Sequence, residues 1–343
     1  MVPSWSPASA LNQPVRIVHC TAAARSMRCA SAAERPSPVC RCRVGRCSSW
    51  TTASLTPPAQ ALRSLFQAPG LHLGPCAHDG LSAKLIERNG SFRFMFMSGF
   101  CVSATQIGEP DAGLISYGEM LDTGRRICAA TRLPVIGDGD TGYGNAMNAK
   151  RTVRGYTQAG FAGVLIEDQQ HPKQCGHMRT RAVVSREEAV ARIQAACDAR
   201  DEGADICILA RSDARSVISL DEALWRVKAF ADAGADAVFV DALTSREDMK
   251  ALCRAVPQQL PKMANMLEGG STPMCSPAEL QDMGFKICAY PLSLLGVSML
   301  AMEKALDSLS TGTIPADVPS FAHIQNRVGF DSYYAEESRY KAQ

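Results

Sequence analysis

Residues 134–168 read PVIGDGDTGYGNAMNAKRTVRGYTQAGFAGVLIED, and this stretch decides the fold. Its apolar runs, Pro134–Asp138 and Gly163–Glu167, predict two buried strands, because parallel strands covered on both faces are apolar throughout. The residues between them predict a helix that stops at Gly160, since glycine readily ends a helix in the left-handed conformation. Strand, helix and strand make one βαβ unit.

The same alternation extends outward over residues 71–343, with helices expected, for example, over Ser185–Ala199, Ser219–Ala233 and Leu294–Leu309. Eight apolar runs mostly separated by helices predict an α/β fold of the (β/α)₈, TIM-barrel type. An open doubly wound sheet would carry a dinucleotide-binding loop after its first strand, and residues 76–79 (CAHD) do not form one. The six further runs are Leu71–Cys76, Phe94–Ser98, Ile206–Arg211, Ala237–Asp241, Pro261–Asn265 and Lys286–Tyr290.

Charge divides the chain into two parts. Residues 1–78 contain eight Arg and one acid, whereas residues 79–343 contain 28 Lys and Arg against 33 Asp and Glu. An acidic body argues against a nucleic-acid-binding enzyme, which needs a basic face. No run of 18 uncharged apolar residues occurs, so the sequence also predicts no transmembrane helix.

The first 70 residues are rich in Ser, Ala, Arg and Pro and show no sustained apolar period. This composition is typical of a disordered organelle transit peptide. A chloroplast leader is the first expectation and a mitochondrial leader the alternative. The catalytic domain is then expected over residues 71–343.

Polar residues follow six successive predicted strands. The carboxyl ends of barrel strands all lie on one face, where the active sites of such barrels are built. A carboxylate directly after an apolar strand is costly to bury unless it is paired or bound to a metal. The strand ends carry Ser98-Gly99, Asp138 with Asp140, Glu167-Asp168, Arg211 with Asp213, Asp241 and Asn265.

Three of these residues predict a metal site. Asp138 and Asp140 share a face of an extended chain, and Glu167 follows the neighbouring strand. Such an all-oxygen set favours Mg²⁺, with Mn²⁺ as the alternative ion. An EF-hand loop starting at Asp138 is excluded, because Tyr143 and Ala149 occupy the places of its Gly and Glu.

Residues 171–185, HPKQCGHMRTRAVVS, are long and polar for a connection between a strand and a helix, and they predict a lid over the site. Cys175 lies between Lys173 and His177 at alternate positions. Two neighbouring cations predict a lowered pKa for the Cys175 thiol and a role in proton transfer.

Seven motifs together resemble the isocitrate lyase/phosphoenolpyruvate mutase superfamily, over about residues 72–340. Within it, the sequence is most similar to the plant petal-death-protein and carboxyvinyl-carboxyphosphonate phosphorylmutase-like branch. The motifs are MSGF (97–100), EPDAGLIS (109–116), GDGDTGYGN (137–145), IEDQ (166–169), KQCGH (173–177), ARSDAR (210–215) and ANMLEGG (264–270).

This resemblance implies a Mg²⁺-dependent barrel that acts on small carboxylates through a pyruvate-type enolate. It also implies a C-terminal helix exchanged between subunits and a homotetramer. Asp138 would bind the metal directly, Asp140 and Glu167 would hold metal-bound water, and Cys175 would be the general acid. The remaining site residues implied are Ser98, Gly99, Phe100, Asp111, Lys173, Gly176, His177, Arg211, Asp241 and Asn265.

Four departures from the family pattern bear on the substrate. Gln174 replaces a lid cation and Asp241 replaces a longer Glu, while Phe96 replaces a Tyr and Phe100 a small residue. Together they disfavour a bulky tricarboxylate and are compatible with a smaller diacid, such as oxaloacetate or a 2-alkylmalate. The resemblance favours a carbon–carbon lyase for such a 2-oxo or 2-hydroxy diacid, because this chain has Cys175-Gly176-His177 where the superfamily's phosphonate mutases carry an Asn-Ser type lid. The alternatives are phosphonate chemistry of the phosphorylmutase type, a methylisocitrate lyase, and a catalytically silent binding protein.

Overall fold

The computed structural model describes residues 57–174 and 181–341. Its eight strands are all parallel and neighbour one another in the order β6-β5-β4-β3-β2-β1-β8-β7. The ring closes between β6 and β7, where the Val238 amide donates to the Pro261 carbonyl at 3.0 Å. All eight predicted strands are confirmed with ends within two residues. They are β1 His72–Ala77, β2 Met95–Met97, β3 Val135–Asp138, β4 Gly163–Glu167, β5 Cys207–Ser212, β6 Ala237–Val240, β7 Met263–Asn265 and β8 Ile287–Tyr290.

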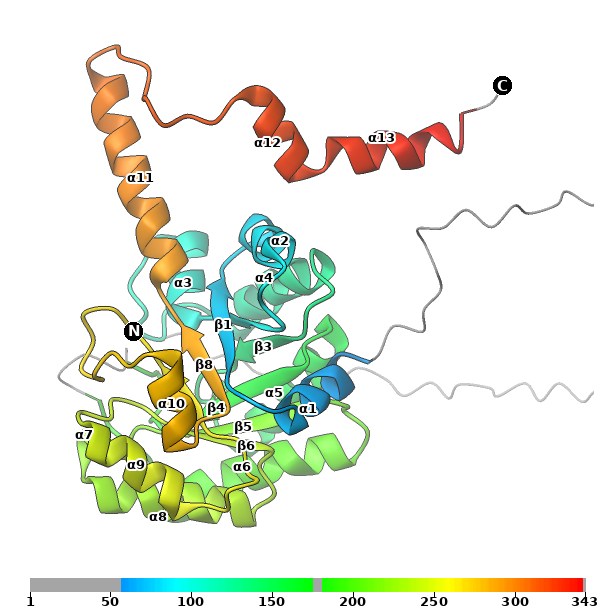
Figure 1. Ribbon diagram of the computed structural model, residues 1–343. Helices are drawn as coiled ribbons and strands as arrows, with labels where there is room; N and C mark the ends of the chain where they lie inside the picture. The colour runs from blue at the N-terminus through cyan, green and yellow to red at the C-terminus, as the bar shows by residue number, and fades with distance from the viewer. Residues whose placement is uncertain (1–56, 175–180, 342–343) are drawn as a thin grey trace, which may run out of the picture. The chain divides into compact units, whose positions relative to one another are not determined.

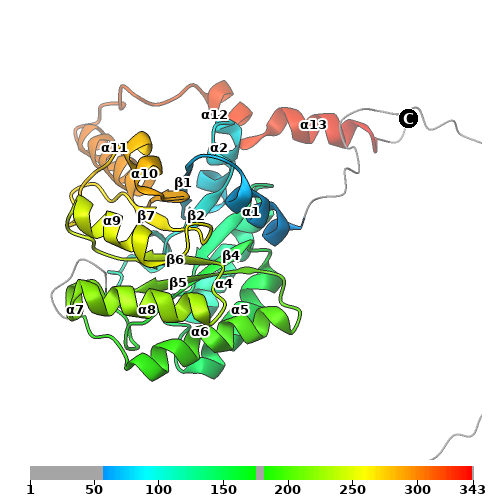
Figure 2. The same cartoon turned by 60° about the horizontal axis from the view of Figure 1, so that its bottom comes forward.

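Helices surround this ring of strands, as Figure 2 shows for α4, α5, α6, α8 and α9. The helices predicted over Ser185–Ala199 and Ser219–Ala233 are confirmed, and each of the two serines accepts the amide of the third residue after it. Helix bounds are α1 Pro58–Gln67, α2 Gly80–Asn89, α3 Gly99–Val102, a π-turn Ser103–Ile107, α4 Tyr117–Ala129, α5 Ala146–Ala159, α6 Arg186–Asp201, α7 Ala214–Val217, α8 Leu220–Asp232, α9 Arg246–Ala255, α10 Pro277–Met283, α11 Ser293–Ser310, α12 Phe321–Val328 and α13 Phe330–Ser338.

Helix α1 packs on the amino-terminal end of the barrel (Figure 1). Leu62 and Leu65 are buried in the same apolar cluster as barrel residues such as Phe94 and Ile287. Residues 58–67 had been assigned to a disordered leader ending at residue 70. That boundary is wrong for this segment, because the two leucines give α1 enough apolar surface to dock on the barrel. The rest of the leader prediction, residues 1–56, lies outside the described residues.

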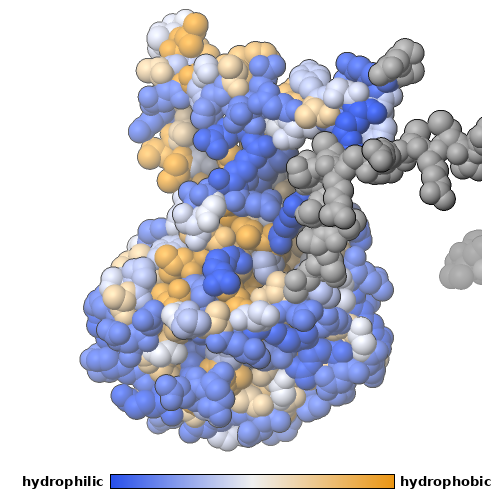
Figure 3. Space-filling model, turned by 45° about the vertical axis from the view of Figure 1, so that its right-hand side comes forward, coloured by the Kyte–Doolittle hydropathy of each residue, from blue (hydrophilic) through white to orange (hydrophobic). Residues whose placement is uncertain are grey.

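The carboxyl-terminal helices expose much apolar surface. Helix α11, which was predicted over Leu294–Leu309, buries only Leu295. Figure 3 shows apolar residues (orange) along it. Helix α12 is joined to α2 by hydrogen bonds from Lys84 Nζ to the Val328 carbonyl (2.7 Å) and from Arg88 to the carbonyls of residues 326 and 327. Exposed apolar residues of α11 are Val297, Met299, Leu300, Met302, Leu306 and Leu309.

Within the described ranges, we find no helix whose length and apolar character would let it cross a membrane.

Candidate active site

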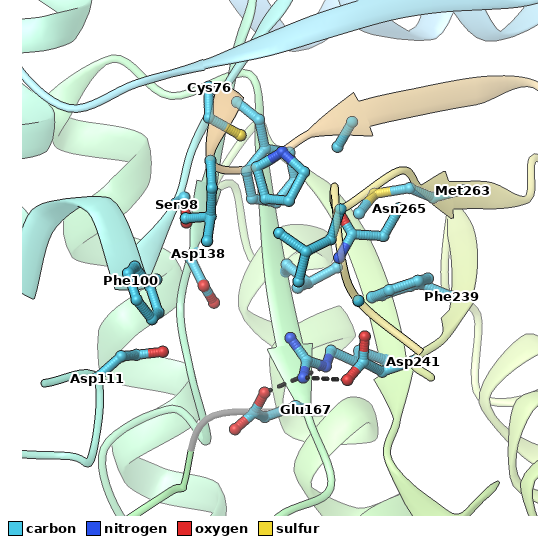
Figure 4. Close-up of a pocket in the computed structure, with 18 of the residues that line it drawn as sticks. Cys76, Ser98, Phe100, Asp111, Asp138, Glu167, Phe239, Asp241, Met263 and Asn265 are labelled. Carbon is cyan, nitrogen blue, oxygen red and sulfur yellow. Dashed lines mark hydrogen bonds and ion pairs between the residues drawn. The ribbon is translucent and has the colours of Figure 1, made fainter. Parts of the chain in front are cut away.

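A cavity of about 280 Å³ opens at the carboxyl-terminal end of the barrel (Figure 4). Its floor is apolar and belongs to the barrel interior, with Phe96 and Leu165 among its members. Its upper wall is charged. Nine of the predicted site residues line it, namely Ser98, Phe100, Asp111, Asp138, Glu167, Lys173, Arg211, Asp241 and Asn265.

Asp138, at the end of β3, is held by two backbone amides. Gly99 donates to its Oδ2 at 3.0 Å, and Asp140 donates to its Oδ1 at 3.2 Å. Asp140 has a φ of +47°, a left-handed conformation that turns the chain immediately after the strand. The Asp140 carbonyl then accepts the amide of Glu167 at 2.9 Å, which ties the ends of β3 and β4 together.

Gly99 allows the backbone to approach this carboxylate closely. A Cβ at this position would lie 2.9 Å from Asp138 Oδ2 and 3.1 Å from both Asp140 Oδ1 and Lys173 Nζ. These are closer than side-chain carbons normally come to polar atoms. The predicted role of Gly99 in the site therefore has a steric basis, because only glycine leaves room for the three charged groups.

Lys173 is buried among carboxylates. Its Nζ lies 2.7 Å from Asp111 Oδ1 and 2.8 Å from Asp140 Oδ1. Burial alone would lower the Lys173 pKa, but the coulombic attraction of Asp140 and Asp111 outweighs it and raises that pKa well above the usual value. Burial raises the pKa of Asp140 to about 7 in spite of Lys173. Lys173 therefore balances charge within the site.

Arg211, on β5, lines the same cavity as Asp138. Its Nε is 3.3 Å from Glu167 Oε2 and 2.9 Å from Asp213 Oδ2, and its Nη2 is 3.1 Å from Asp241 Oδ2. Its Nη1 donates no hydrogen bond to any of the described residues. That nitrogen is therefore a donor available to an anion in the cavity.

Glu167 presents an unsatisfied oxygen. Its side chain is 1% exposed, and its Oε1 has no partner within the described part of the chain. Burial raises the Glu167 pKa well above its usual value, although Arg211 opposes the shift. An unpartnered buried carboxylate oxygen is costly and indicates a missing water, ion or ligand.

The carboxylates do not form a cluster that would hold an ion directly. No three His, Cys, Asp or Glu side chains in residues 57–174 and 181–341 lie in such a group. A site with Asp138 as the direct ligand and water between the ion and the other carboxylates fits better. Mg²⁺ dehydrates reluctantly and usually keeps several waters, so the oxygens of Asp138, Asp140 and Glu167 suit it in this form.

Two polar residues that support the site were not predicted. Arg181 donates to Asp213 Oδ1 at 2.5 Å and to Asp241 Oδ2 at 3.0 Å, and Gln169 Nε2 donates to Asp213 Oδ1 at 3.2 Å. Gln169 belongs to the IEDQ motif, and its position directly after β4 could have predicted its place in the site. For Arg181 the sequence offered only the positive charge of its segment, because only tertiary contacts bring it to β5 and β6.

A second layer of charged groups fixes Asp213. The Asp168 carboxylate accepts hydrogen bonds from the Asp213 amide at 2.8 Å and from the Ser212 hydroxyl at 2.7 Å. Arg226 Nη1 lies 3.1 Å from Asp168 Oδ2. Arg192 donates to the Glu167 carbonyl at 2.7 Å. These contacts hold the ends of β4 and β5 in register. The predicted residues Cys175, Gly176 and His177 lie outside the described residues.

Comparison with known proteins gives consistent matches over most of the chain. A family model described as phosphoenolpyruvate phosphomutase matches residues 62–310. The 2,3-dimethylmalate lyase of Eubacterium barkeri is 39% identical, over 82% of this chain and 98% of its own. A chloroplastic carboxyvinyl-carboxyphosphonate phosphorylmutase of Arabidopsis thaliana is 37% identical, over 80% and 83%.

Solved structures agree with these sequence matches. Oxaloacetate acetylhydrolase in complex with 3,3-difluorooxalacetate superposes with a TM-score of 0.79 at 30% identity, covering 84% of this chain and 99% of that one. Phosphonopyruvate hydrolase in complex with oxalate and Mg²⁺ gives a TM-score of 0.73 at 29% identity, with coverage of 82% and 99%.

Proposed function

The chain belongs to the phosphoenolpyruvate phosphomutase family, and on that premise we propose that it is a Mg²⁺-dependent carbon–carbon lyase acting on a small 2-oxo or 2-hydroxy diacid. One observation carries the proposal. The cavity places two atoms that make no hydrogen bond to any described residue, Nη1 of Arg211 and Oε1 of Glu167, in one space with Asp138. An anionic substrate needs the first group, and a hydrated cation would satisfy the second.

The substrate's carboxylate binds between two sets of donors. Arg211 Nη1 supplies charge-assisted hydrogen bonds from β5. The hydroxyl of Ser98 and the start of α3, including Phe100, face the same space from β2. Asn265 adds an amide from β7. The apolar floor with Phe96 and Leu165 takes the carbon chain and excludes water from it.

When bound, Mg²⁺ would supply Lewis-acid stabilisation of the negative charge that develops on the substrate oxygens. The structure of phosphonopyruvate hydrolase, a relative, holds oxalate together with Mg²⁺, which supports this choice of ion. Asp138 is the residue that would hold it, with Asp140 and Glu167 acting through water. Gly99 keeps Asp138 in place through its amide.

In a 2-hydroxy diacid, a cavity carboxylate takes the proton of the 2-hydroxyl group, C2 becomes a carbonyl carbon as the C2–C3 bond breaks, and the electron pair of that bond stays on the departing C3 fragment as an enolate. A 2-oxo diacid first adds water at C2, and the hydrate then supplies the hydroxyl group for the same cleavage. Arg211 is placed to stabilise the resulting enolate by charge. We assign to Cys175 the delivery of a proton to the carbanion carbon, supported by its position between Lys173 and His177 in the sequence. Cys175→Ala should then abolish turnover and retain ligand binding.

The direct test incubates the purified full chain with Mg²⁺ and a panel of oxaloacetate, 2-alkylmalates, methylisocitrate and phosphonopyruvate, with and without chelator. Cleavage of a small diacid that stops with chelator is the expected result. Turnover of methylisocitrate alone would replace the proposed substrate class. Activity that persists in chelator would overturn the role of the metal.

Phosphonate chemistry is the second candidate. A relative at 37% identity is named a carboxyvinyl-carboxyphosphonate phosphorylmutase, and the matching family is that of phosphoenolpyruvate phosphomutase. The same oxygen ligands and the same arginine would serve such a reaction. Phosphonopyruvate in the panel distinguishes the two, because phosphate transfer or release is detected separately from carbon–carbon cleavage.

We also propose that the chain assembles as a homotetramer through α11. This helix exposes six large apolar residues along its length, and monomeric proteins rarely expose a contiguous apolar surface of this kind. Light scattering on the full chain tests the assembly. Met302→Glu, a charge on this apolar surface, should lower the mass towards that of the monomer.

The basic, acid-poor segment before α1 is proposed as a chloroplast transit peptide. Its composition supports this, as does the chloroplastic phosphorylmutase of Arabidopsis thaliana among its relatives. Fusion of residues 1–56 to a fluorescent protein should direct it to plastids. Import into mitochondria would select the alternative leader.

A further inference from the structure

Two arginines share the same two aspartate oxygens beside the cavity. Arg181 Nη1 lies 2.5 Å from Asp213 Oδ1 and 3.0 Å from Asp241 Oδ2. Arg211 Nη2 lies 2.9 Å and 3.1 Å from the same two atoms. All four side chains are 13% exposed or less. Arg181 does not line the cavity, so it acts on a ligand only through these neighbours.

The charges explain why a second arginine is needed there. Without Arg181, the buried carboxylates of Asp213 and Asp241 would share the guanidinium of Arg211. Two buried aspartates against one guanidinium would oppose the entry of an anion. Arg181 offsets one of those charges. It does so by pairing with the oxygens that already hold Arg211 Nη2, so Nη1 is left to the cavity.

The backbone delivers Arg181 to this position. The Ala182 carbonyl accepts the Gln170 amide, and the Val184 amide donates to the Asp168 carbonyl, each at 2.9 Å. Arg226 Nη2 donates to the Val184 carbonyl at 2.9 Å. This pairing anchors the residues directly after Arg181 to the end of β4. Its side chain therefore reaches Asp213 and Asp241 from a fixed backbone.

We propose that Arg181 is a positioning residue for anion binding. It offsets one of the two negative charges of Asp213 and Asp241 and thereby keeps the Nη1 of Arg211 directed towards the substrate carboxylate. The inference rests on the proposed function, because it assumes that the cavity binds a small dicarboxylate. It predicts that loss of the Arg181 charge weakens ligand binding more than it slows the bond-breaking step.

The test measures oxalate binding to the full chain in Mg²⁺ by calorimetry, together with KM, kcat and Tm. We expect R181M and R181Q to raise the oxalate Kd about tenfold or more, and R181K to stay within about threefold, since it keeps the charge. KM should rise more than kcat falls. R246M is the matched control, because Arg246 pairs with Glu279 at 2.8 Å outside the cavity.

A double variant keeps the test decisive if R181M folds poorly. In R181M/D241N, one negative charge leaves together with the positive one, so the oxalate Kd should recover towards the wild-type value. Neutral variants that lose Tm but bind oxalate within twofold of wild type would make Arg181 merely structural and overturn the inference. So would an R181K as weak as R181M, or a wild-type chain that binds no oxalate.

Failure of the proposed function is distinguishable from these outcomes. Oxalate binding requires no turnover. If the wild-type chain cleaves none of the diacids but the Arg181 variants change oxalate affinity as expected, the lyase proposal falls and the role of Arg181 stands. If diacids are cleaved and the Arg181 variants bind oxalate normally, the lyase proposal stands and the role of Arg181 falls.

Discussion

The two ends of the barrel are built from the same strands and differ in almost every physical respect. At the amino-terminal end, Gly163 of β4 faces Leu62 of α1 within an apolar cluster. Four residues along the same strand, Glu167 is buried, and its Oε1 has no hydrogen-bond partner in the described part of the chain. The first end contributes stability by removing apolar surface from water. The second end lowers stability, because it removes charged groups from water. Lys173 and Arg211 offset this cost by pairing with the carboxylates.

This difference implies that the two ends are separable by mutation. A change at the α1 end should lower the free energy of unfolding and leave turnover per folded molecule intact. A change at the cavity end should lower turnover and leave the free energy of unfolding almost unchanged, because an ionic site contributes little net stability once desolvation is counted. Substitutions at each end test whether stability and turnover depend on different ends of the barrel.

The largest effect is expected at Asp138. Asp138→Asn keeps the shape and removes the charge that would hold the cation, so kcat/KM should fall about 1000-fold while the fold persists. Steady-state kinetics and circular dichroism check both statements. Asp205→Asn is the matched control at the other end, where Asp205 pairs with Arg63 of α1 at 2.7 Å. Normal turnover in Asp138→Asn would remove the metal site from Asp138.

The next effect tests the apolar end. Leu62 is 0% exposed, and Leu62→Ala should destabilise the chain by about 3 kcal/mol through lost burial and an unfilled cavity. Chemical denaturation measures this. Leu81→Ala, at a leucine that is 52% exposed, should cost less than about 0.5 kcal/mol. If Leu62→Ala lowered kcat in the folded protein, the two ends would be coupled.

A smaller effect is expected at Gly99. The added methyl group of Gly99→Ala would press on Asp138 and Lys173, so turnover should fall about tenfold with little change in unfolding free energy. Gly118→Ala in α4 is the control, since its Cβ would meet its nearest atom at 3.8 Å. Alanine there should stabilise the helix by about 0.5 kcal/mol. Equal kinetics for both variants would show that the close approach at Gly99 is unimportant.

The sequence predicted the strands and the end of the barrel that carries chemistry, because both depend on local patterns. Apolar runs such as Gly163–Glu167 are continuous, and the polar residue at the end of each run can be read directly from the sequence. The superfamily was likewise predicted from motifs and is confirmed. These features required no knowledge of which side chains meet.

Features that depend on pairing across the fold were not predictable. Helix α1 was missed because its few apolar residues gain their meaning only from the barrel end they cover. Arg181 was missed because its partners, Asp213 and Asp241, are 32 and 60 residues away. The position of Lys173 between Asp111 and Asp140 was not predictable either, because only three-dimensional packing brings these residues together.

The smallest effect concerns the outer layer that supports the cavity end. Hydrogen bonds to Glu222 from Arg186, and then from Arg226, lower the Glu222 pKa to about 2 from its usual 4.5. Because the folded-state pKa is depressed, the ionised carboxylate stabilises the fold fully above about pH 4.5, and this contribution is lost as the pH falls towards 2.

Glu222→Gln should therefore lower stability by up to about 1 kcal/mol at neutral pH, since solvent screening limits such pairs. The difference from wild type should shrink steadily between pH 4.5 and pH 2. Thermal unfolding across that range measures it, with Asp232→Asn on the same helix as the control at an exposed carboxylate. Because Arg226 also binds Asp168 beneath the cavity, a pH-independent deficit would show that Glu222 acts by orienting Arg226 and not by its charge. The outer helices would then help to position the charged groups of the cavity. Stability and activity would be separable only for substitutions within the barrel strands.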